Sequence, residues 1–122
     1  MSYLEIILGP MFSGKTSQLL NIYKTEKLSS REVLVINYSL DTRYSDKDLS
    51  THDKQMIKCR QTRLLRELYD IKSNRGVDLS LYDTILINEG QFFSDLYDWV
   101  SYVLSNYTVK IYICGLDGDF KR

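Results

Sequence analysis

One eight-residue stretch constrains this chain more than any other: GPMFSGKT at positions 9–16. It matches the pattern G-x-x-x-x-G-K-[ST] at every required position. The apolar run at 3–8 before it predicts a strand buried in a sheet, and residues 17–27 after it are predicted to form a helix. Glycines in such a loop let several backbone N–H groups converge on one anion, and the helix dipole adds positive potential there. The stretch therefore predicts a phosphate-binding loop rather than an ordinary glycine turn.

Further apolar runs predict the rest of the fold. They are nearly continuous rather than alternating, which is typical of parallel strands covered on both faces. The fold class we expect is α/β, with a P-loop NTPase-like, open, mainly parallel sheet and flanking helices, forming one domain over 1–122. The strongly marked elements are strands at 32–38, 83–87 and 109–114 and an amphipathic helix at 96–104.

Other stretches are marked less strongly. Residues 41–53 are polar and are predicted to form a loop, whereas 56–59 could form a short strand. Leucines at helical spacing predict a helix over 63–71, and the polar stretch at 72–81, with Gly76, predicts a turn.

Charge and cysteine content limit the partners and the compartment. The 16 basic and 16 acidic side chains cancel, so neither nucleic acid nor an anionic membrane is expected as a partner. No apolar run is long enough to cross a membrane, and the N-terminus lacks the layout of a signal peptide. Cys59 and Cys114 match no metal or redox spacing, and Cys114 is expected to be a buried thiol. These observations favour a cytoplasmic, reducing location.

Phosphoryl transfer needs positioned phosphates, a metal, charge neutralisation and a group that orients the nucleophile. Lys15 can reach the β- and γ-phosphates, and the Thr16 hydroxyl can hold Mg²⁺. Arg43 is a candidate for neutralising phosphate charge, the alternative being a solvated loop arginine. Glu89 follows a predicted buried strand and is the best candidate for a general base, the alternative being a surface acid near a helix.

Five motifs in this order resemble the thymidine kinase family of the cellular cytosolic, bacterial and poxvirus type. They are GPMFSGKT at 9–16, DTRYS at 41–45, THD at 51–53, EGQFF at 89–93 and LDGDFKR at 116–122. The resemblance spans nearly the whole chain and does not extend to the herpesvirus type. It implies transfer of the ATP γ-phosphate to the 5′-hydroxyl of thymidine with Mg²⁺, in DNA precursor salvage.

The resemblance also implies roles for individual residues. Glu89 would be the catalytic base, and Thr16 would hold Mg²⁺. The residues expected at the ATP site are Gly9, Pro10, Met11, Phe12, Ser13, Gly14, Lys15, Thr16, Asp41, Thr42, Arg43, Asn88, Gly90 and Gln91. Those expected to line the thymidine pocket are Met11, Phe92, Leu116 and Phe120. A homo-oligomer is possible, because the family often forms tetramers.

Two departures from the family pattern carry expectations of their own. The family usually has Asp before the catalytic Glu, and here Asn88 stands there, so Mg²⁺ binding should be weaker. The family's zinc-binding segment and its lid over thymidine are not in these residues, so the chain is expected to be C-terminally truncated. Two interpretations stay open: a thymidine kinase, or a catalytically inactive ATP-binding remnant of one. A third interpretation, an ATPase that acts on nucleic acid, is not favoured by the balanced charge.

Overall fold

The computed structural model describes residues 2–9, 15–38, 45–50 and 56–116. The strands are β1 (Tyr3–Gly9), β2 (Val33–Tyr38), β3 (Ser45–Ser50), β4 (Met56–Thr62), β5 (Tyr69–Asp70), β6 (Arg75–Gly76), β7 (Thr84–Asn88) and β8 (Lys110–Leu116). The α-helices are α1 (Lys15–Leu28) and α2 (Leu96–Asn106), and three short 3₁₀ turns are η1 (Leu65–Glu67), η2 (Leu79–Leu81) and η3 (Gly90–Phe92).

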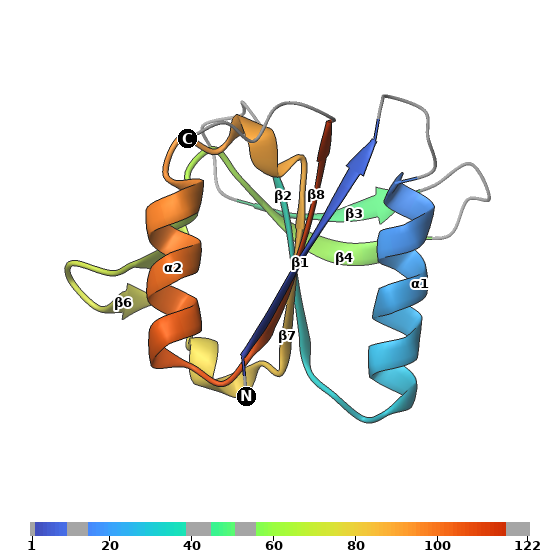
Figure 1. Ribbon diagram of the computed structural model, residues 1–122, viewed down its shortest axis with the longest axis horizontal. Coiled ribbons are helices and arrows are strands. Elements are labelled where there is room, and N and C mark those ends of the chain that lie inside the picture. The colour runs from blue at the N-terminus through green and yellow to red at the C-terminus, as the bar shows by residue number, and fades with distance from the viewer. Residues whose placement is uncertain (1, 10–14, 39–44, 51–55, 117–122) are drawn as a thin grey trace.

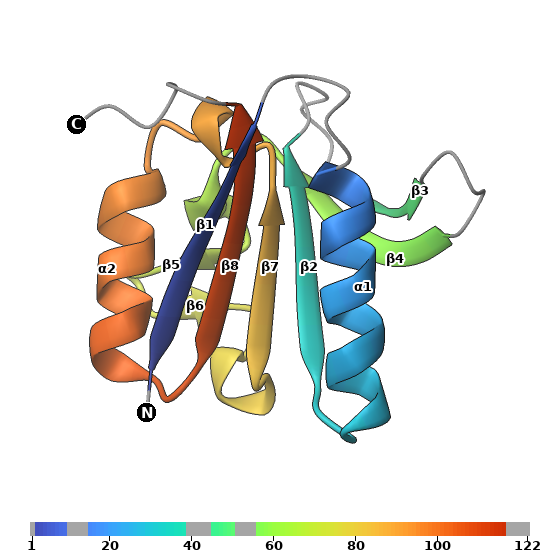
Figure 2. The ribbon, with the colours of Figure 1, turned by 45° about the vertical axis from the view of Figure 1, so that its right-hand side comes forward.

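The main sheet of the described residues has the strand order β1-β8-β7-β2-β4-β3. Neighbouring strands are parallel except β3, which runs antiparallel to β4. Helix α1 covers one face of the sheet and α2 covers the other (Figures 1 and 2). The expected α/β class with a mainly parallel sheet and flanking helices is therefore confirmed.

The central strands are buried on both faces, as their continuous apolar runs predict. On β7, Leu86 packs in a cluster with Leu19 and Leu20 of α1, whereas Ile85 and Ile87 belong to the cluster that contains Trp99 of α2. Successive side chains of a strand point to opposite faces, so a strand between two helices must be apolar at every position. Burial on both faces therefore accounts for the continuous apolar run of β7.

The prediction that residues 3–8 form a buried strand is wrong as regards burial. The strand forms, but Tyr3, Leu4 and Ile6 are 46%, 41% and 44% exposed. The reason is the position of β1 at the edge of the described sheet, where β8 is its one neighbour among the described strands. An apolar run indicates a strand without indicating where in the sheet that strand lies.

The loop predicted at 41–53 is also partly wrong, because residues 45–50 form strand β3. Its backbone pairs with β4 from Ser45 opposite Gln61 to Ser50 opposite Met56. The pairing partner, and not local propensity, makes this polar stretch a strand. The short strand expected at 56–59 is present and extends to Thr62 as β4.

The helix predicted over 63–71 is replaced by the single 3₁₀ turn η1 and the short strand β5. The Asp95 carboxylate accepts hydrogen bonds from the backbone N–H groups of Leu65 (3.1 Å) and Arg66 (2.9 Å), which closes the turn from outside. The carbonyl of Leu68 then accepts from the Val77 N–H at 2.9 Å instead of continuing a helix. The leucine spacing reflects burial of an irregular segment against the core.

Gly76 in β6 has a conformation that other residues rarely adopt. Its φ is +130°, and a Cβ at this position would lie 2.1 Å from the carbonyl oxygen of Leu68. Because the obstacle is backbone, replacing Gly76 with Ala should lower the free energy of unfolding by about 1–3 kcal/mol. Urea unfolding followed by Trp99 fluorescence would measure this, with Ser73→Ala in the adjacent exposed turn as control. An unchanged midpoint for Gly76→Ala would contradict the argument.

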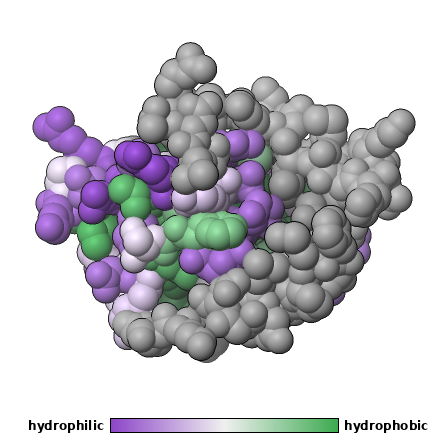
Figure 3. Space-filling view, turned by 90° about the horizontal axis from the view of Figure 1, so that it is seen from above, coloured by the Kyte–Doolittle hydropathy of each residue, from purple (hydrophilic) through white to green (hydrophobic). Residues whose placement is uncertain are grey.

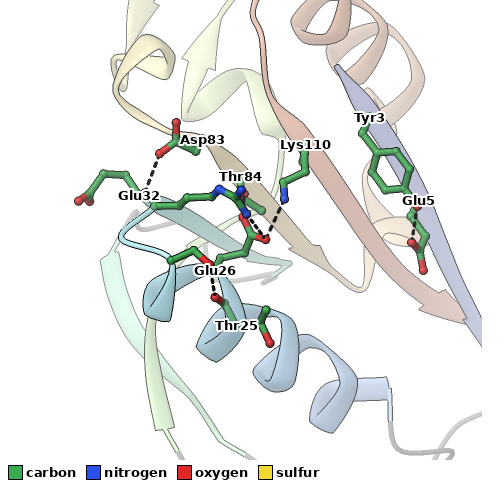
Figure 4. Close-up of polar contacts among 10 residues, drawn as sticks. Tyr3, Glu5, Thr25, Glu26, Glu32, Asp83, Thr84 and Lys110 are labelled. Atoms are coloured by element: carbon green, nitrogen blue, oxygen red, sulfur yellow. Dashed lines mark hydrogen bonds and ion pairs between the residues drawn. The ribbon is translucent and has the colours of Figure 1, made fainter. Parts of the chain in front are cut away.

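A buried carboxylate joins α1 to the amino-terminal ends of β7 and β8 (Figure 4). Glu26 is 4% exposed, and its carboxylate accepts hydrogen bonds from Thr84 Oγ1 (2.5 Å) and Lys110 Nζ (2.8 Å) and pairs with Arg31 Nη1 (3.2 Å). Three donors compensate this carboxylate for the water it loses on burial. We call these four residues the Glu26 cluster.

The Glu26 cluster should make stability depend on pH. Burial raises the pKa of the Glu26 carboxyl, but the hydrogen bonds and charges of Lys110, Thr84 and Arg31 outweigh burial, so the pKa lies below its ordinary value of 4.5. A carboxyl whose pKa is lower in the folded state stabilises that state fully above pH 4.5, and this contribution is lost as pH falls through the folded-state pKa. Urea midpoints measured from pH 6 to pH 3 should therefore fall less steeply for Glu26→Gln than for the wild type. Parallel slopes would contradict this.

Candidate active site

Four parallel strands end at the same edge of the sheet. Residue pairing in the sheet sets Gly9 opposite Leu116, Cys114 opposite Asn88, and Asn88 opposite Asn37. Adjacent strands lie about 4.8 Å apart and residues rise about 3.3 Å along a strand, so Gly9 and Asn88, two strands and two residues apart, are separated by roughly 12 Å. Ligands of open parallel sheets bind at this carboxyl edge. Figure 3 views the molecule from this side, where apolar patches lie among hydrophilic side chains.

The strand and helix that flank the phosphate-binding motif are in place. Gly9 is the last residue of β1, and Lys15 and Thr16 are the first residues of α1. Helix α1 begins at the carboxyl edge, with its N-terminus near the end of β1 (Figure 1). Its dipole thus favours an anion at this edge. Residues 10–14, the middle of the motif, lie outside the described residues.

Asn88, the last residue of β7, contacts the side chain of Asn37 on the neighbouring strand β2. It is 6% exposed, and its Nδ2 donates a hydrogen bond of 2.9 Å to Oδ1 of Asn37. Asn37 is half-buried near the end of β2 and is the direct strand partner of Asn88. Two amide side chains therefore meet at the carboxyl edge, between β2 and β7.

Glu89 directly follows β7 and has a left-handed backbone, with φ 56° and ψ 45°. Residues other than glycine rarely adopt this conformation, which costs about 1–2 kcal/mol. The side chain is exposed. Strained backbone of this kind is frequent at active sites, because it directs a side chain where a relaxed turn would not. The geometry leaves the carboxylate accessible to a bound molecule at the carboxyl edge.

The turn η3 after Glu89 carries Phe92, an expected pocket residue, in contact with a second ring that sequence analysis did not indicate. Phe92 is 48% exposed, and its ring lies 5.1 Å from that of Tyr38 at the end of β2, with 34° between the planes. Tyr38 also meets Phe93 edge-on at 5.3 Å. Offset and edge-on aromatic contacts of this kind are favourable. Phe92 is thus held in a half-exposed position at the carboxyl edge.

Gly90 and Gln91 line a groove of about 560 Å³ that runs between β1 and α2. Its walls include Leu4, Ile6 and Tyr97, and it is mainly apolar. Gln91 Oε1 is buried and accepts no hydrogen bond from the described residues. The side chain of Gln91 therefore borders this groove, whereas Phe92 next to it packs toward β2.

Several expected site residues cannot be compared with the structure. Leu116 is the last residue of β8 at the carboxyl edge, and its place in a thymidine pocket stays a prediction. Asp41, Thr42, Arg43 and Phe120 lie outside the described residues, as do Pro10, Met11, Phe12, Ser13 and Gly14.

Asn37 and Tyr38 are the two residues at this edge that sequence analysis missed. Both lie at the end of an apolar strand, and that position was the signal that could have identified them, because parallel strand ends line ligand sites. Within the described residues, no group of three or more His, Cys, Asp or Glu side chains could hold a metal ion. Of the described helices, none combines the length and apolar character required to cross a membrane.

A mainly parallel α/β sheet, a phosphate-loop motif between its first strand and first helix, and an acidic residue after a buried strand are together typical of the P-loop NTPase-like class of α/β proteins. Within that class, comparison of this sequence with known proteins identifies one family. The family model described as thymidine kinase matches residues 2–122, and the chain belongs to the thymidine kinase family.

Individual relatives agree with this assignment. The chain is 38% identical over 123 residues to thymidine kinase 1 of Dictyostelium discoideum, covering 98% of this chain and 51% of the relative. It is 38% identical over 120 residues to the thymidine kinase of Yaba monkey tumor virus, covering 98% and 61%. It is 35% identical over 119 residues to the cytosolic thymidine kinase of Cricetulus griseus, covering 98% and 47%. The chain thus spans about half to three fifths of the length of these relatives.

Proposed function

We propose that this chain is the ATP-binding part of a thymidine kinase, which transfers the γ-phosphate of ATP to the 5′-hydroxyl of thymidine. The observation that carries the proposal is the shared sheet edge. The end of β1, the start of α1 and the Asn88–Glu89 step all lie there. Membership of the thymidine kinase family supports the choice of substrate.

In this proposal the phosphate loop binds ATP. Gly9 and the N-terminus of α1 offer backbone N–H groups to the phosphates, and Lys15 neutralises the β- and γ-phosphate charge. Asp41, Thr42 and Arg43 border the same phosphates, with Arg43 able to bind phosphate oxygens through its guanidinium group. Asn88, Gly90 and Gln91, which follow one another closely at the end of β7, are proposed as the remaining residues of the ATP site.

The proposed nucleophile is the thymidine 5′-hydroxyl, and Glu89 accepts its proton. The exposed carboxylate at the carboxyl edge can be approached by a bound hydroxyl, which is the geometric requirement of a general base. Phe92, supported by Tyr38, offers a flat apolar surface to the thymine ring. Met11, Leu116 and Phe120 are proposed to form the rest of this pocket.

The residues present fit a weakly held Mg²⁺. Mg²⁺ prefers oxygen ligands and is usually bound through one or two protein groups together with substrate phosphates and water. The nitrogen of the Asn88 side chain donates to Asn37, so its neutral carbonyl oxygen is proposed as one protein ligand, and the Thr16 hydroxyl would be the second. When bound, the metal would neutralise charge on the transferred phosphoryl group.

The proposal extends to location and assembly. A cytoplasmic location is supported by cysteines at non-metal spacing and by a relative whose name includes the word cytosolic. The balanced charge argues against nucleic acid as a partner. A homo-oligomer, as the family resemblance implies, could be tested by light scattering.

The experiment that tests the proposed function is a thymidine phosphorylation assay with ATP and Mg²⁺ on this chain. A thermal-shift measurement with ATP should accompany it, because a ligand that binds only the folded state raises Tm. Turnover together with ATP stabilisation would support the proposal. Stabilisation without turnover would favour an inactive ATP-binding protein instead. If ATP gave neither turnover nor stabilisation, the proposed ATP site would be contradicted.

A further inference from the structure

The amide pair Asn37–Asn88 has a chemical consequence at the ATP site. The pair joins β2 to β7 at the carboxyl edge through one hydrogen bond of 2.9 Å, from Asn88 Nδ2 to Asn37 Oδ1. Asn88 is 6% exposed. A primary amide has two donors on nitrogen and one carbonyl acceptor, and rotation of the amide by 180° exchanges their positions. In the structure Asn37 presents its carbonyl oxygen to this contact, so the nitrogen end of the Asn88 amide faces β2.

The orientation matters because the two ends of an amide have opposite effects on a cation. A carbonyl oxygen attracts Mg²⁺, whereas an N–H group repels it and instead attracts phosphate oxygens. Because Asn37 accepts from the nitrogen, the carbonyl oxygen of Asn88 is the end left for other contacts. Groups that hold a metal ligand in one orientation commonly change metal affinity 10–100-fold when they are removed.

We propose that Asn37 is a positioning residue that orients the Asn88 amide with its oxygen available to Mg²⁺, and so determines how strongly Mg²⁺ promotes ATP binding. The inference rests on the proposed function, because it requires an ATP site at this edge. Asn37 acts through Asn88 and touches neither ATP nor metal.

The test measures the dissociation constant of ATP by calorimetry in Mg²⁺ and again in EDTA, on the whole chain. The ratio of the EDTA value to the Mg²⁺ value is the magnesium factor. Asn37→Leu, similar in size but without an acceptor, should lower this factor by about 10-fold. Asn37→Asp keeps the acceptor for Asn88 Nδ2, and its magnesium factor should be at least that of the wild type.

Two further variants make the test specific. Asn88→Leu should lower the magnesium factor as far as Asn37→Leu does, and the double variant should lower it no further, because both changes remove one interaction. Asn106→Leu alters an exposed asparagine in α2 whose Nδ2 donates to the Tyr102 carbonyl, and it should change nothing. Thermal unfolding without ligand would show which variants are folded. Because the magnesium factor compares two measurements on the same folded variant, a general loss of ATP affinity cancels from it.

The inference is overturned if Asn37→Leu keeps the wild-type magnesium factor, or if Asn37→Asp loses it as Asn37→Leu does. Independent, additive effects of Asn37→Leu and Asn88→Leu would also overturn it. In all three cases ATP still binds, so the proposed function stands. Absence of ATP binding by the wild type in both solutions would instead overturn the proposed function, and the inference with it.

Discussion

Replacing Glu89 with Gln is expected to lower the rate of thymidine phosphorylation by about 10²–10⁴-fold, the usual contribution of a positioned general base. The amide keeps the size and the backbone of the glutamate but cannot accept the proton of the 5′-hydroxyl. ATP stabilisation measured by thermal shift should not change, because the proposed function assigns phosphate binding to the phosphate-loop motif and not to Glu89. A radiometric thymidine phosphorylation assay under saturating ATP would measure the loss.

Two variants separate the chemical role of Glu89 from a structural one. Glu32→Gln changes an exposed glutamate that lies 3.9 Å from Lys27, and it should keep full activity. Glu89→Gly removes the carboxylate but suits the left-handed backbone at φ 56°, so its free energy of unfolding should be unchanged or slightly higher while activity is lost. Full turnover in Glu89→Gln would show that another group accepts the proton.

Replacing Glu26 with Ala is expected to lower the free energy of unfolding by about 3 kcal/mol at pH 7. The change leaves the buried hydroxyl of Thr84 without its acceptor and the ammonium group of Lys110 without its closest anion. A domain of this size is stable by about 5–15 kcal/mol, so the loss is a substantial fraction. Urea unfolding followed by the fluorescence of Trp99, the single tryptophan, would measure it.

The matched control for Glu26→Ala is Glu32→Ala. Glu32 and Lys27 are 65% and 42% exposed, and exposed pairs of this kind contribute about 0–1 kcal/mol. Glu26 lies near the end of the sheet opposite the proposed ATP site, so ATP affinity per folded molecule should be the same in both variants. A loss in Glu26→Ala no larger than that in Glu32→Ala would show that the Glu26 cluster contributes little to stability.

The strands of the central sheet were predictable because they are buried on both faces. β2, β7 and β8 appear in the sequence as continuous apolar runs, and helix α2 has its apolar residues at helical spacing. The helix expected at 63–71 failed for the opposite reason. There Asp95, about thirty positions away along the chain, supplies the carboxylate that closes η1, and no local pattern records such a partner.

The candidate site shows the same division. Lys15, Asn88 and Glu89 could be named as candidates because each occupies a fixed place in a motif or lies at the end of an apolar strand. Asn37 and Tyr38 were missed, because their importance comes from strand pairing between β2 and β7 and from ring contacts with Phe92. The left-handed backbone of Glu89 could not be predicted either, because the residue type glutamate does not indicate this conformation.

The amino-acid sequence by itself determined the phosphate-loop motif, the α/β class and the family to which the chain belongs. These depend on residue type and spacing within short segments, where local sterics and burial act. The tertiary structure alone decided that β1 lies at the sheet edge, that Glu26 joins α1 to two strands, and that Asn37 holds Asn88. Those features depend on which distant segments become neighbours, and that is set by packing of the whole chain.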